Sequence, residues 1–255
     1  MLSLLLSLSM ATGVSTPKPS ASMARIPAGS YQPLYGAIGA APVVVRAFRL
    51  DREPVTRGEY LAFVRAHPQW QRGAVRPIFA GEGYLSAWPG ALDAGNATDL
   101  RRPVTEVSWF AAKAYCEANG KRLPTVDEWE YAASASETRT DAAGDARFIR
   151  RLLALYAVRP NDGILPPVGS GFRNVYGVRD LHGLAWEWTL DFNEAMGAGD
   201  SHEAGSSAGG HMASCASAAI GAGDATNYPA FMRYAFRSSL AGRSTARTLG
   251  FRCAA

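Results

Sequence analysis

Lysine, cysteine and histidine are all scarce in this chain of 255 residues. Lysine occurs only at positions 18, 113 and 121, so nearly all of the positive charge comes from arginine. The formal net charge of +4 is scattered and forms no stripe of interleaved basic and aromatic residues, which excludes a recognisable nucleic-acid surface. Three cysteines allow at most one internal disulfide, and four widely separated histidines do not indicate a three-histidine iron site.

The sequence also lacks an apolar run long enough to cross a bilayer. Residues 1–11, MLSLLLSLSMA, resemble the hydrophobic part of a secretory signal without its usual positive N-terminal region. Residues 12–22 are rich in Ser, Thr and Pro, as in a processing site or linker. We therefore expect residues 1–23 to be signal peptide and linker, followed by one domain over 24–255. The protein would be periplasmic or secreted, without membrane contact after export; a disordered apolar tail is the alternative.

The clearest local pattern lies between residues 103 and 133. Ser108 stands where a helix N-cap belongs and Gly120 where a left-handed C-terminal cap belongs, with an amphipathic pattern between them. Thr125 and Glu128 have the spacing of a capping box. The sequence therefore predicts two consecutive helices packed against a core.

Three further elements follow from local patterns. Residues 43–50 are predicted to form a strand, because β-branched and alternating residues dominate them. Thr56 and Glu59 form a second capping box, which predicts a helix through Val64. Apolar residues and arginines at helical spacing predict an amphipathic helix over 147–156. That helix would pack on the domain with a solvated arginine face; binding to an anionic membrane or a partner is the alternative.

Residues 107–132 read VSWFAAKAYCEANGKRLPTVDEWEYA. This stretch closely resembles the signature of the formylglycine-generating enzyme family, also called the sulfatase-modifying-factor family. Further segments agree with the family in the same order, at residues 25–30, 53–56, 174–177, 186–188 and 250–253. The resemblance covers roughly residues 24–255. It implies a single α+β domain of a modified C-type-lectin type, with few regular elements and many ordered loops, and we expect a monomer.

The resemblance implies a structural calcium site on the segment from Asp180 to Trp188. Leu184 departs from the asparagine that is usual after the glycine of this segment. Calcium prefers all-oxygen ligand sets, and a backbone carbonyl ligand does not depend on its side chain. Carried over by position, the ligands are the carbonyls of His182, Gly183 and Ala185 and the carboxylate of Glu187. A second family calcium site would involve Asn161 and Asp162, but little of its motif is present.

Two of the three cysteines, Cys116 and Cys253, occupy positions where the family can carry a disulfide. The resemblance implies that this bond ties the C-terminal strand to the central helix. We expect the bond to form in an exported protein, and two buried free thiols if the protein stays in the cytoplasm. With that bond formed, Cys215 has no cysteine left to pair with.

Formylglycine-generating enzymes bind Cu(I) through two closely spaced cysteines, because soft thiolates suit that ion. Residues 209–215 resemble the run that leads to the first of these cysteines. The second should follow before the arginine motif at 233–237, and no cysteine is present there. The two-thiolate copper centre therefore cannot be assembled from this sequence, and sulfatase activation is the first function to exclude.

Cys215 and His211 are the remaining catalytic candidates. His211 replaces a serine that is usual in the family's active pocket, and with Cys215, and Met212 as a third donor, it is chemically able to hold copper or iron. The alternative is a packed thiol on a loop over residues 197–224, which is rich in Gly, Ala and Ser.

A pocket is expected beside this segment, walled by Trp186 or Trp188, Arg233 and Arg237. The two arginines would either bind a carboxylate-bearing ligand through bidentate hydrogen bonds or neutralise buried carboxylates such as Glu128 or Glu130.

Three functions remain open, and whether the protein is an enzyme is not decided by its sequence. The first is an oxidase-like role in the maturation of a secreted protein or small molecule, similar to siderophore-maturation relatives of the family. The second is a non-catalytic periplasmic accessory factor for a copper enzyme such as nitrite reductase. The third is a lectin-like module that binds a small molecule or peptide.

Overall fold

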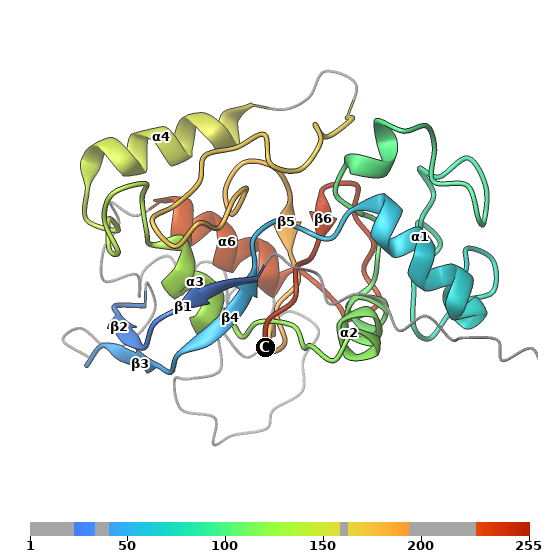
Figure 1. Cartoon of the computed structure of the whole chain (residues 1–255), viewed down its shortest axis with the longest axis horizontal. Helices are drawn as coiled ribbons and strands as arrows, with labels where there is room; N and C mark the ends of the chain where they lie inside the picture. The colour runs from blue at the N-terminus through green and yellow to red at the C-terminus, as the bar shows by residue number, and fades with distance from the viewer. Residues whose placement is uncertain (1–22, 34–40, 159–162, 194–227) are drawn as a thin grey trace, which may run out of the picture.

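The computed structural model describes residues 23–33, 41–158, 163–193 and 228–255 (Figure 1). It confirms an α+β domain with few regular elements and long connecting loops. In chain order the elements are β1 (Met23–Ile26), β2 (Gly29–Tyr31), β3 (Val43–Val45), β4 (Phe48–Asp51), α1 (Arg57–Ala66), the 3-10 helices η1 (Pro68–Trp70) and η2 (Asp99–Arg101), α2 (Trp109–Ala118), α3 (Val126–Ala133), α4 (Ala146–Ala157), β5 (Trp186–Glu187), α6 (Tyr228–Ser238) and β6 (Leu249–Gly250).

The described strands pair two by two. β1 lies antiparallel to β4, β2 lies antiparallel to β3, and β5 lies parallel to β6. In the first pair Ala24 stands opposite Leu50 and Ile26 opposite Phe48, so alternate residues of both strands point into the core.

The single strand predicted over residues 43–50 is wrong in one respect, because the structure divides it into β3 and β4. Arg46 and Ala47 are consecutive and both exposed, which breaks the alternation that one continuous strand requires. The chain bends there, and its two halves pair with different partners, β3 with β2 and β4 with β1.

The predicted helices begin at the expected caps. Thr56 and Thr125 each accept a hydrogen bond from the backbone of the glutamate three residues later, and that glutamate bonds back, which completes both capping boxes. Ser108 caps α2, and Gly120 adopts φ +66° just after its end. The first helix extends two residues beyond the predicted end at Val64.

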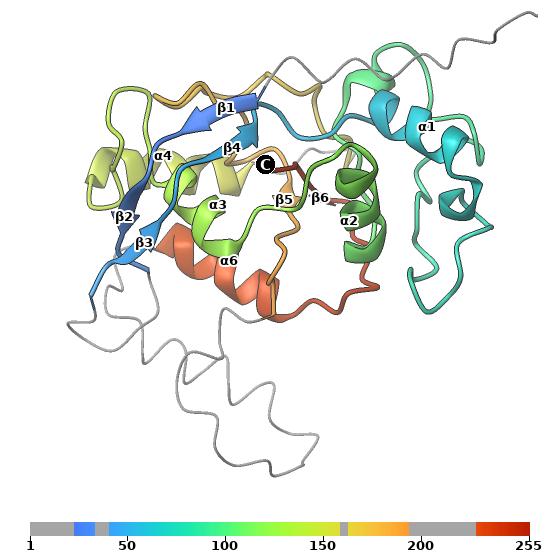
Figure 2. The same cartoon turned by 60° about the horizontal axis from the view of Figure 1, so that its bottom comes forward.

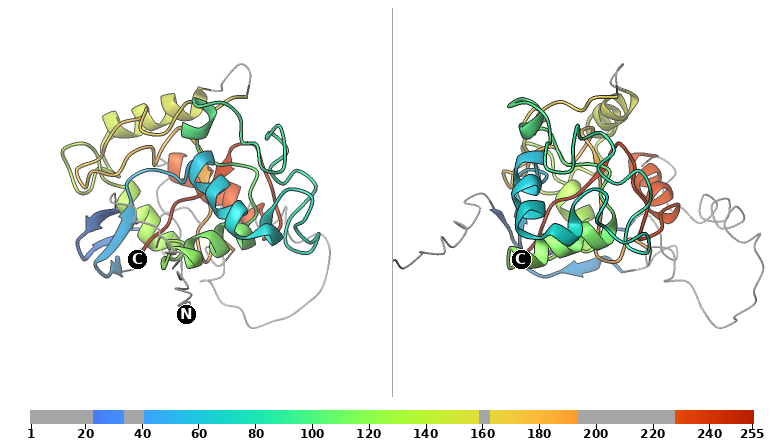
Figure 3. Two further views of the ribbon diagram at one scale, coloured as in Figure 1. Left: turned by 45° about the vertical axis from the view of Figure 1, so that its right-hand side comes forward. Right: turned by 90° about the vertical axis from the view of Figure 1, so that its right-hand side faces the viewer.

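Helix α3 lies between the β1–β4 pair and helix α6 (Figures 1 and 2). Trp129 and Ala132 on α3 join the core cluster of Ile26 and Leu50, whereas Glu130 forms ion pairs with α6. Helix α1 lies at the end of the molecule opposite β2 and β3 (Figures 1 and 3). It packs into a second core cluster, which also takes in α2.

The C-terminal residues run through the centre of the domain (Figure 1). The backbone of Ala255 exchanges two hydrogen bonds with Arg49, at 2.7 and 2.9 Å, and Ala254 pairs with Arg122 in the same way. Cys253 forms a disulfide with Cys116 of α2, across a sequence separation of 137 residues. The end of the chain is therefore bonded to β4, to the α2–α3 connection and to α2.

Helix α4 packs on the domain, as the first of the two interpretations of residues 147–156 predicts. Asp145 caps it, Phe148 and Leu152 are buried, and Arg150 lies on the exposed side. Across the described part of the chain, no helix is both long and apolar enough to cross a membrane.

Candidate functional site

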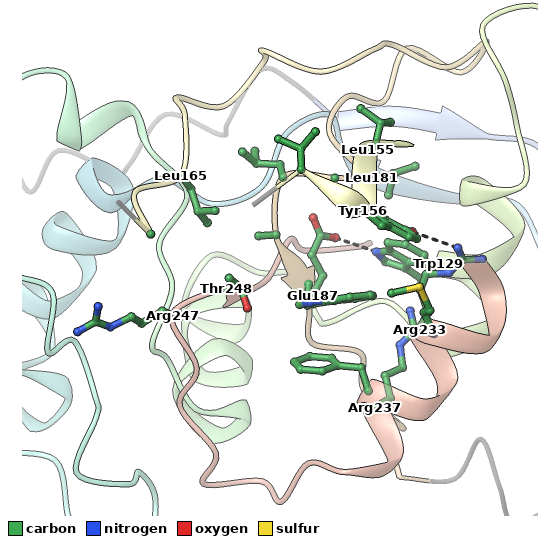
Figure 4. A pocket seen from close by; sticks show the side chains of 18 residues that line it. Trp129, Leu155, Tyr156, Leu165, Leu181, Glu187, Arg233, Arg237, Arg247 and Thr248 are labelled. Atoms are coloured by element: carbon green, nitrogen blue, oxygen red, sulfur yellow. Dashed lines mark hydrogen bonds between the residues drawn. The ribbon is translucent and has the colours of Figure 1, made fainter. Parts of the chain in front are cut away.

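A cavity of about 470 Å³ opens between α3, the end of α4, α6 and the segment around β5 (Figure 4). That volume lies in the usual range of small-molecule sites. Its charged lining residues are Glu187, Arg233, Arg237 and Arg247. Its apolar and aromatic lining includes Trp129, Leu155, Tyr156, Leu181, Leu184, Trp186, Met232 and Phe236.

Two arginines of α6 share one buried carboxylate, that of Glu130 on α3. Arg233 and Arg237 are four residues apart and therefore lie on one face of the helix. Arg233 donates from Nε at 3.0 and 3.1 Å and from Nη2 at 2.6 Å, and Arg237 donates from Nη1 at 2.5 Å. Burial alone would raise the pKa of Glu130, but the two guanidinium groups outweigh it and lower that pKa to about 2.

This arrangement shows the second of the two roles expected for the arginines. They neutralise a buried carboxylate, and the carboxylate is Glu130. Glu128 lies on another side of α3, where Arg122 holds it through two hydrogen bonds of 2.6 Å.

A chain of hydrogen bonds runs from Arg233 through Tyr156 to His182. Nη1 of Arg233 lies 3.2 Å from the Tyr156 hydroxyl, which lies 2.8 Å from Nδ1 of His182, while Nε2 lies 2.9 Å from the carbonyl oxygen of Ala133. A carbonyl oxygen only accepts, so Nε2 carries the proton and Nδ1 accepts from Tyr156. Burial, with a contribution from Arg233, lowers the pKa of His182 to about 3. His182 is therefore a neutral imidazole with both nitrogens engaged.

Glu187 is the second buried carboxylate of the site. Its side chain and that of Arg252 are both 0% exposed. Arg252 donates from Nε to Oε2 and from Nη2 to Oε1, both at 2.8 Å, and the Trp129 indole donates to Oε2 at 2.7 Å (Figure 4). Glu187 thus has one arginine to itself, whereas Glu130 has two.

Residues 11–255 match the family described as sulfatase-modifying factor enzyme 1-like domain. The chain belongs to this family. The sulfatase-modifying-factor domain of this protein is 32% identical over 192 residues to the formylglycine-generating enzyme of Mycobacterium tuberculosis, covering 58% of this chain and 64% of that protein. It is 30% identical over 192 residues to the mouse protein named inactive C-alpha-formylglycine-generating enzyme 2, covering 62% of each chain. The chain thus spans less than two thirds of the length of these relatives.

Among solved structures, that of PvdO from Pseudomonas aeruginosa is similar, with a TM-score of 0.50 at 23% identity. The likeness covers 91% of this chain and 93% of that one. At this identity it supports the fold alone.

Of the calcium ligands implied by the resemblance, Gly183, Ala185 and Glu187 line the cavity, and His182 is buried beside them. Gly183 adopts φ +84°, which lets the chain turn between His182 and Leu184. The ligand set is all oxygen, and Oε1 of Glu187 accepts one hydrogen bond, which leaves it a free lone pair. The residues therefore fit calcium, provided that the ion shares the Glu187 carboxylate with Arg252. No cluster of three or more His, Cys, Asp or Glu side chains suited to a metal occurs among the described residues, so the backbone carbonyls would supply most ligands.

The two tryptophans expected in the pocket of this sulfatase-modifying-factor domain lie in different places. Trp186 lines the cavity and stacks on Phe236, with ring centroids 4.8 Å apart. Trp188 does not line it, so of the two tryptophans expected as alternatives for the pocket wall it is Trp186 that lies there. The Trp188 indole is fully buried in the core, donates to the carbonyl of Val107 at 2.8 Å and packs against Phe192.

The candidate catalytic residues Cys215 and His211, together with Met212, lie outside the described residues, as do Asn161 and Asp162. Tyr156 and Trp129 are among the cavity residues that the sequence did not assign to the site. Trp129 was recognisable only as a buried helix residue. Tyr156 lies in a segment that departs from the family pattern, so no motif pointed to it.

Proposed function

We propose that this protein is an exported relative of the formylglycine-generating enzymes that acts in the oxidative maturation of a secreted protein or small molecule, without activating sulfatases. The number of free thiols supports the last part of this proposal, that the protein does not activate sulfatases. Of three cysteines, Cys116 and Cys253 are joined to each other, so Cys215 is the one thiol left. A single thiolate cannot form the two-thiolate Cu(I) site, and a shared fold does not carry the chemistry without its site.

Cys215 and His211 are the residues that would hold copper or iron in such a reaction. The cavity supports the binding half of this proposal, because its aromatic walls and arginines suit a small organic ligand or a peptide side chain. Calcium on the segment of His182, Gly183, Ala185 and Glu187 would have a structural role.

A non-catalytic role is the second candidate: an accessory factor for a periplasmic copper enzyme such as nitrite reductase, or a lectin-like binding module. The observation that favours it is the cavity itself, whose aromatic walls and arginines can bind a ligand without a redox metal.

Metal content separates the two candidates. The protein is purified from an oxidising compartment, incubated with copper or ferrous ions, desalted and measured by elemental analysis. The same measurement is made on the double variant Cys215→Ala, His211→Ala. We expect about one equivalent of copper or iron in the parent protein, with loss in the variant and calcium unchanged in both.

If only calcium is found in the parent protein after loading, metal-dependent oxidation loses its basis. The accessory or binding role then takes its place, and co-purification with one enzyme would identify the partner. Export is tested separately by the mass of the mature N-terminus, which should lack the first residues of the chain.

A further inference from the structure

The charges around Glu130 do not balance. Arg233, Arg237 and Glu130 are 6%, 4% and 5% exposed, and two guanidinium groups face one carboxylate. The other buried pair, Glu187 with Arg252, is neutral by itself. Among the described residues one positive charge is therefore left over at the cavity wall, and an unbalanced buried charge is costly.

The N–H groups that have no acceptor among the described residues belong to Arg237. Arg233 uses Nε and Nη2 on Glu130 and Nη1 on Tyr156. Arg237 donates to Glu130 only from Nη1. No described residue accepts a hydrogen bond from its Nε or Nη2. Nε and Nη2 form one edge of the guanidinium group, which is the edge that a planar carboxylate binds with two parallel hydrogen bonds.

The surroundings of that edge are aromatic. The Arg237 guanidinium lies 4.9 Å from the ring centre of Trp129, and Trp186 stacks on Phe236, at a ring distance of 4.8 Å and an angle of 24°. All four side chains line the same cavity (Figure 4). A small hydrophilic anion would leave these rings uncovered, and a neutral aromatic molecule would leave the charge uncompensated.

We infer that the cavity binds an aromatic or similarly apolar carboxylate, with the carboxylate on the Nε and Nη2 edge of Arg237 and the apolar body between the cavity's aromatic side chains. The ligand supplies the missing negative charge. As the substrate or ligand class of the same cavity, this inference rests on the proposed function.

Isothermal titration with three probes tests the ligand class. 2-Naphthoate carries both features, 2-naphthalenemethanol lacks the charge, and acetate lacks the apolar body. We expect saturable binding of 2-naphthoate, with each of the other probes at least about 10-fold weaker. The alcohol lacks a hydrogen-bonded charge, and acetate lacks the apolar area that the aromatic walls would bury, and each contributes about that factor or more. Absence of 2-naphthoate binding, or equal binding of the alcohol, overturns the inference.

Two variants test the residue. Arg237→Met keeps a long apolar side chain beside Trp129 and leaves Glu130 paired with Arg233, so the variant should still fold. Its affinity for 2-naphthoate should fall at least about 10-fold. Arg150→Gln removes one positive charge from the exposed side of α4 and should bind within about 2-fold of the parent. Equal effects of the two variants would show that only overall charge matters and would overturn the assignment to Arg237.

Neither measurement depends on a bound redox metal. If the metal analysis fails while 2-naphthoate binds through Arg237, the cavity is a ligand site of a binding protein. If the metal is present and 2-naphthoate does not bind, the oxidative role stands and the ligand class is wrong.

Discussion

The two buried carboxylates of the site, Glu130 and Glu187, pair with different numbers of arginines, and this number predicts how each responds to substitution. Glu187 and Arg252 form a closed pair in which both side chains are 0% exposed. Arg252 also bonds the backbone carbonyls of Asp51 and Arg179. It therefore joins β4, the 179–187 segment and the C-terminal strand at one point.

Replacement of Arg252 by methionine should lower the free energy of unfolding by about 3–5 kcal/mol, because it leaves the Glu187 carboxylate buried without a counter-charge. Urea denaturation measures the change. The matched control is Arg122→Met, which breaks a pair whose arginine is 39% exposed and should lose about 1 kcal/mol or less. Equal losses in the two variants would contradict the assigned importance of burial.

The pH dependence of stability should report Glu130. Its pKa falls from 4.5 to about 2 on folding, so its contribution is complete above pH 4.5 and is lost as the pH falls through the folded pKa. We expect the free energy of unfolding to drop between pH 5 and 2, with on the order of 3 kcal/mol from this group. Glu130→Gln should be less stable at pH 7 but should show a flatter slope below pH 5. An unchanged slope in that variant would assign the acid transition to other groups.

At the scale of single elements, the turn that carries His182, Gly183, Ala185 and Glu187 should respond to calcium. If the ion binds there, calcium at 100 times its dissociation constant should stabilise the fold by about 2.7 kcal/mol, or about 5–10 °C in melting temperature. Chelation with EGTA should reverse the shift, and magnesium should not reproduce it. In Glu187→Gln the calcium-dependent increment should disappear, whatever the melting temperature of the variant without calcium. A wild-type protein that melts identically in calcium and EGTA would remove calcium from this segment.

Helix starts were predictable because their signals are local. Thr56 with Glu59 and Thr125 with Glu128 satisfy their own backbone groups within one turn, whatever surrounds them. The division of residues 43–50 into two strands was not predictable in the same way. It depends on β1 and β2, which lie about 20 residues earlier in the chain and pair with different halves of the segment.

Residues of the site were predictable from the sequence only in the segments that resemble the family. The resemblance supplied Trp186, Arg233 and Arg237, but the choice of Glu130 over Glu128 depends on which face of α3 meets α6. Tyr156 contacts His182 through tertiary packing of α4, and no local pattern encodes that contact. The role of Tyr156 therefore follows from the position of α4 in the fold and not from the local sequence.

At the scale of the whole molecule, the Cys116–Cys253 bond closes a loop with a sequence separation of 137 residues. Reduction with dithiothreitol should lower the free energy of unfolding by up to ~4–5 kcal/mol, because the reduced unfolded chain gains conformational freedom. Thiol titration in denaturant should count one free thiol before reduction and three after it. Cys215→Ala should show the same loss of stability and should lower both counts by one. A parent protein with three reactive thiols before reduction would show that the bond does not form.

The central position of residues 249–255 also has a consequence for synthesis on the ribosome. These residues supply backbone partners for Arg49, Val55 and Arg122, which are made much earlier. Chains emerge from the N-terminus onward, so the β1–β4 pair and the α2–α3 unit must wait for a partner that is translated after all other described residues. The nascent chain therefore leaves apolar surface uncovered until residues 249–255 have been made, which makes it a natural client for chaperones.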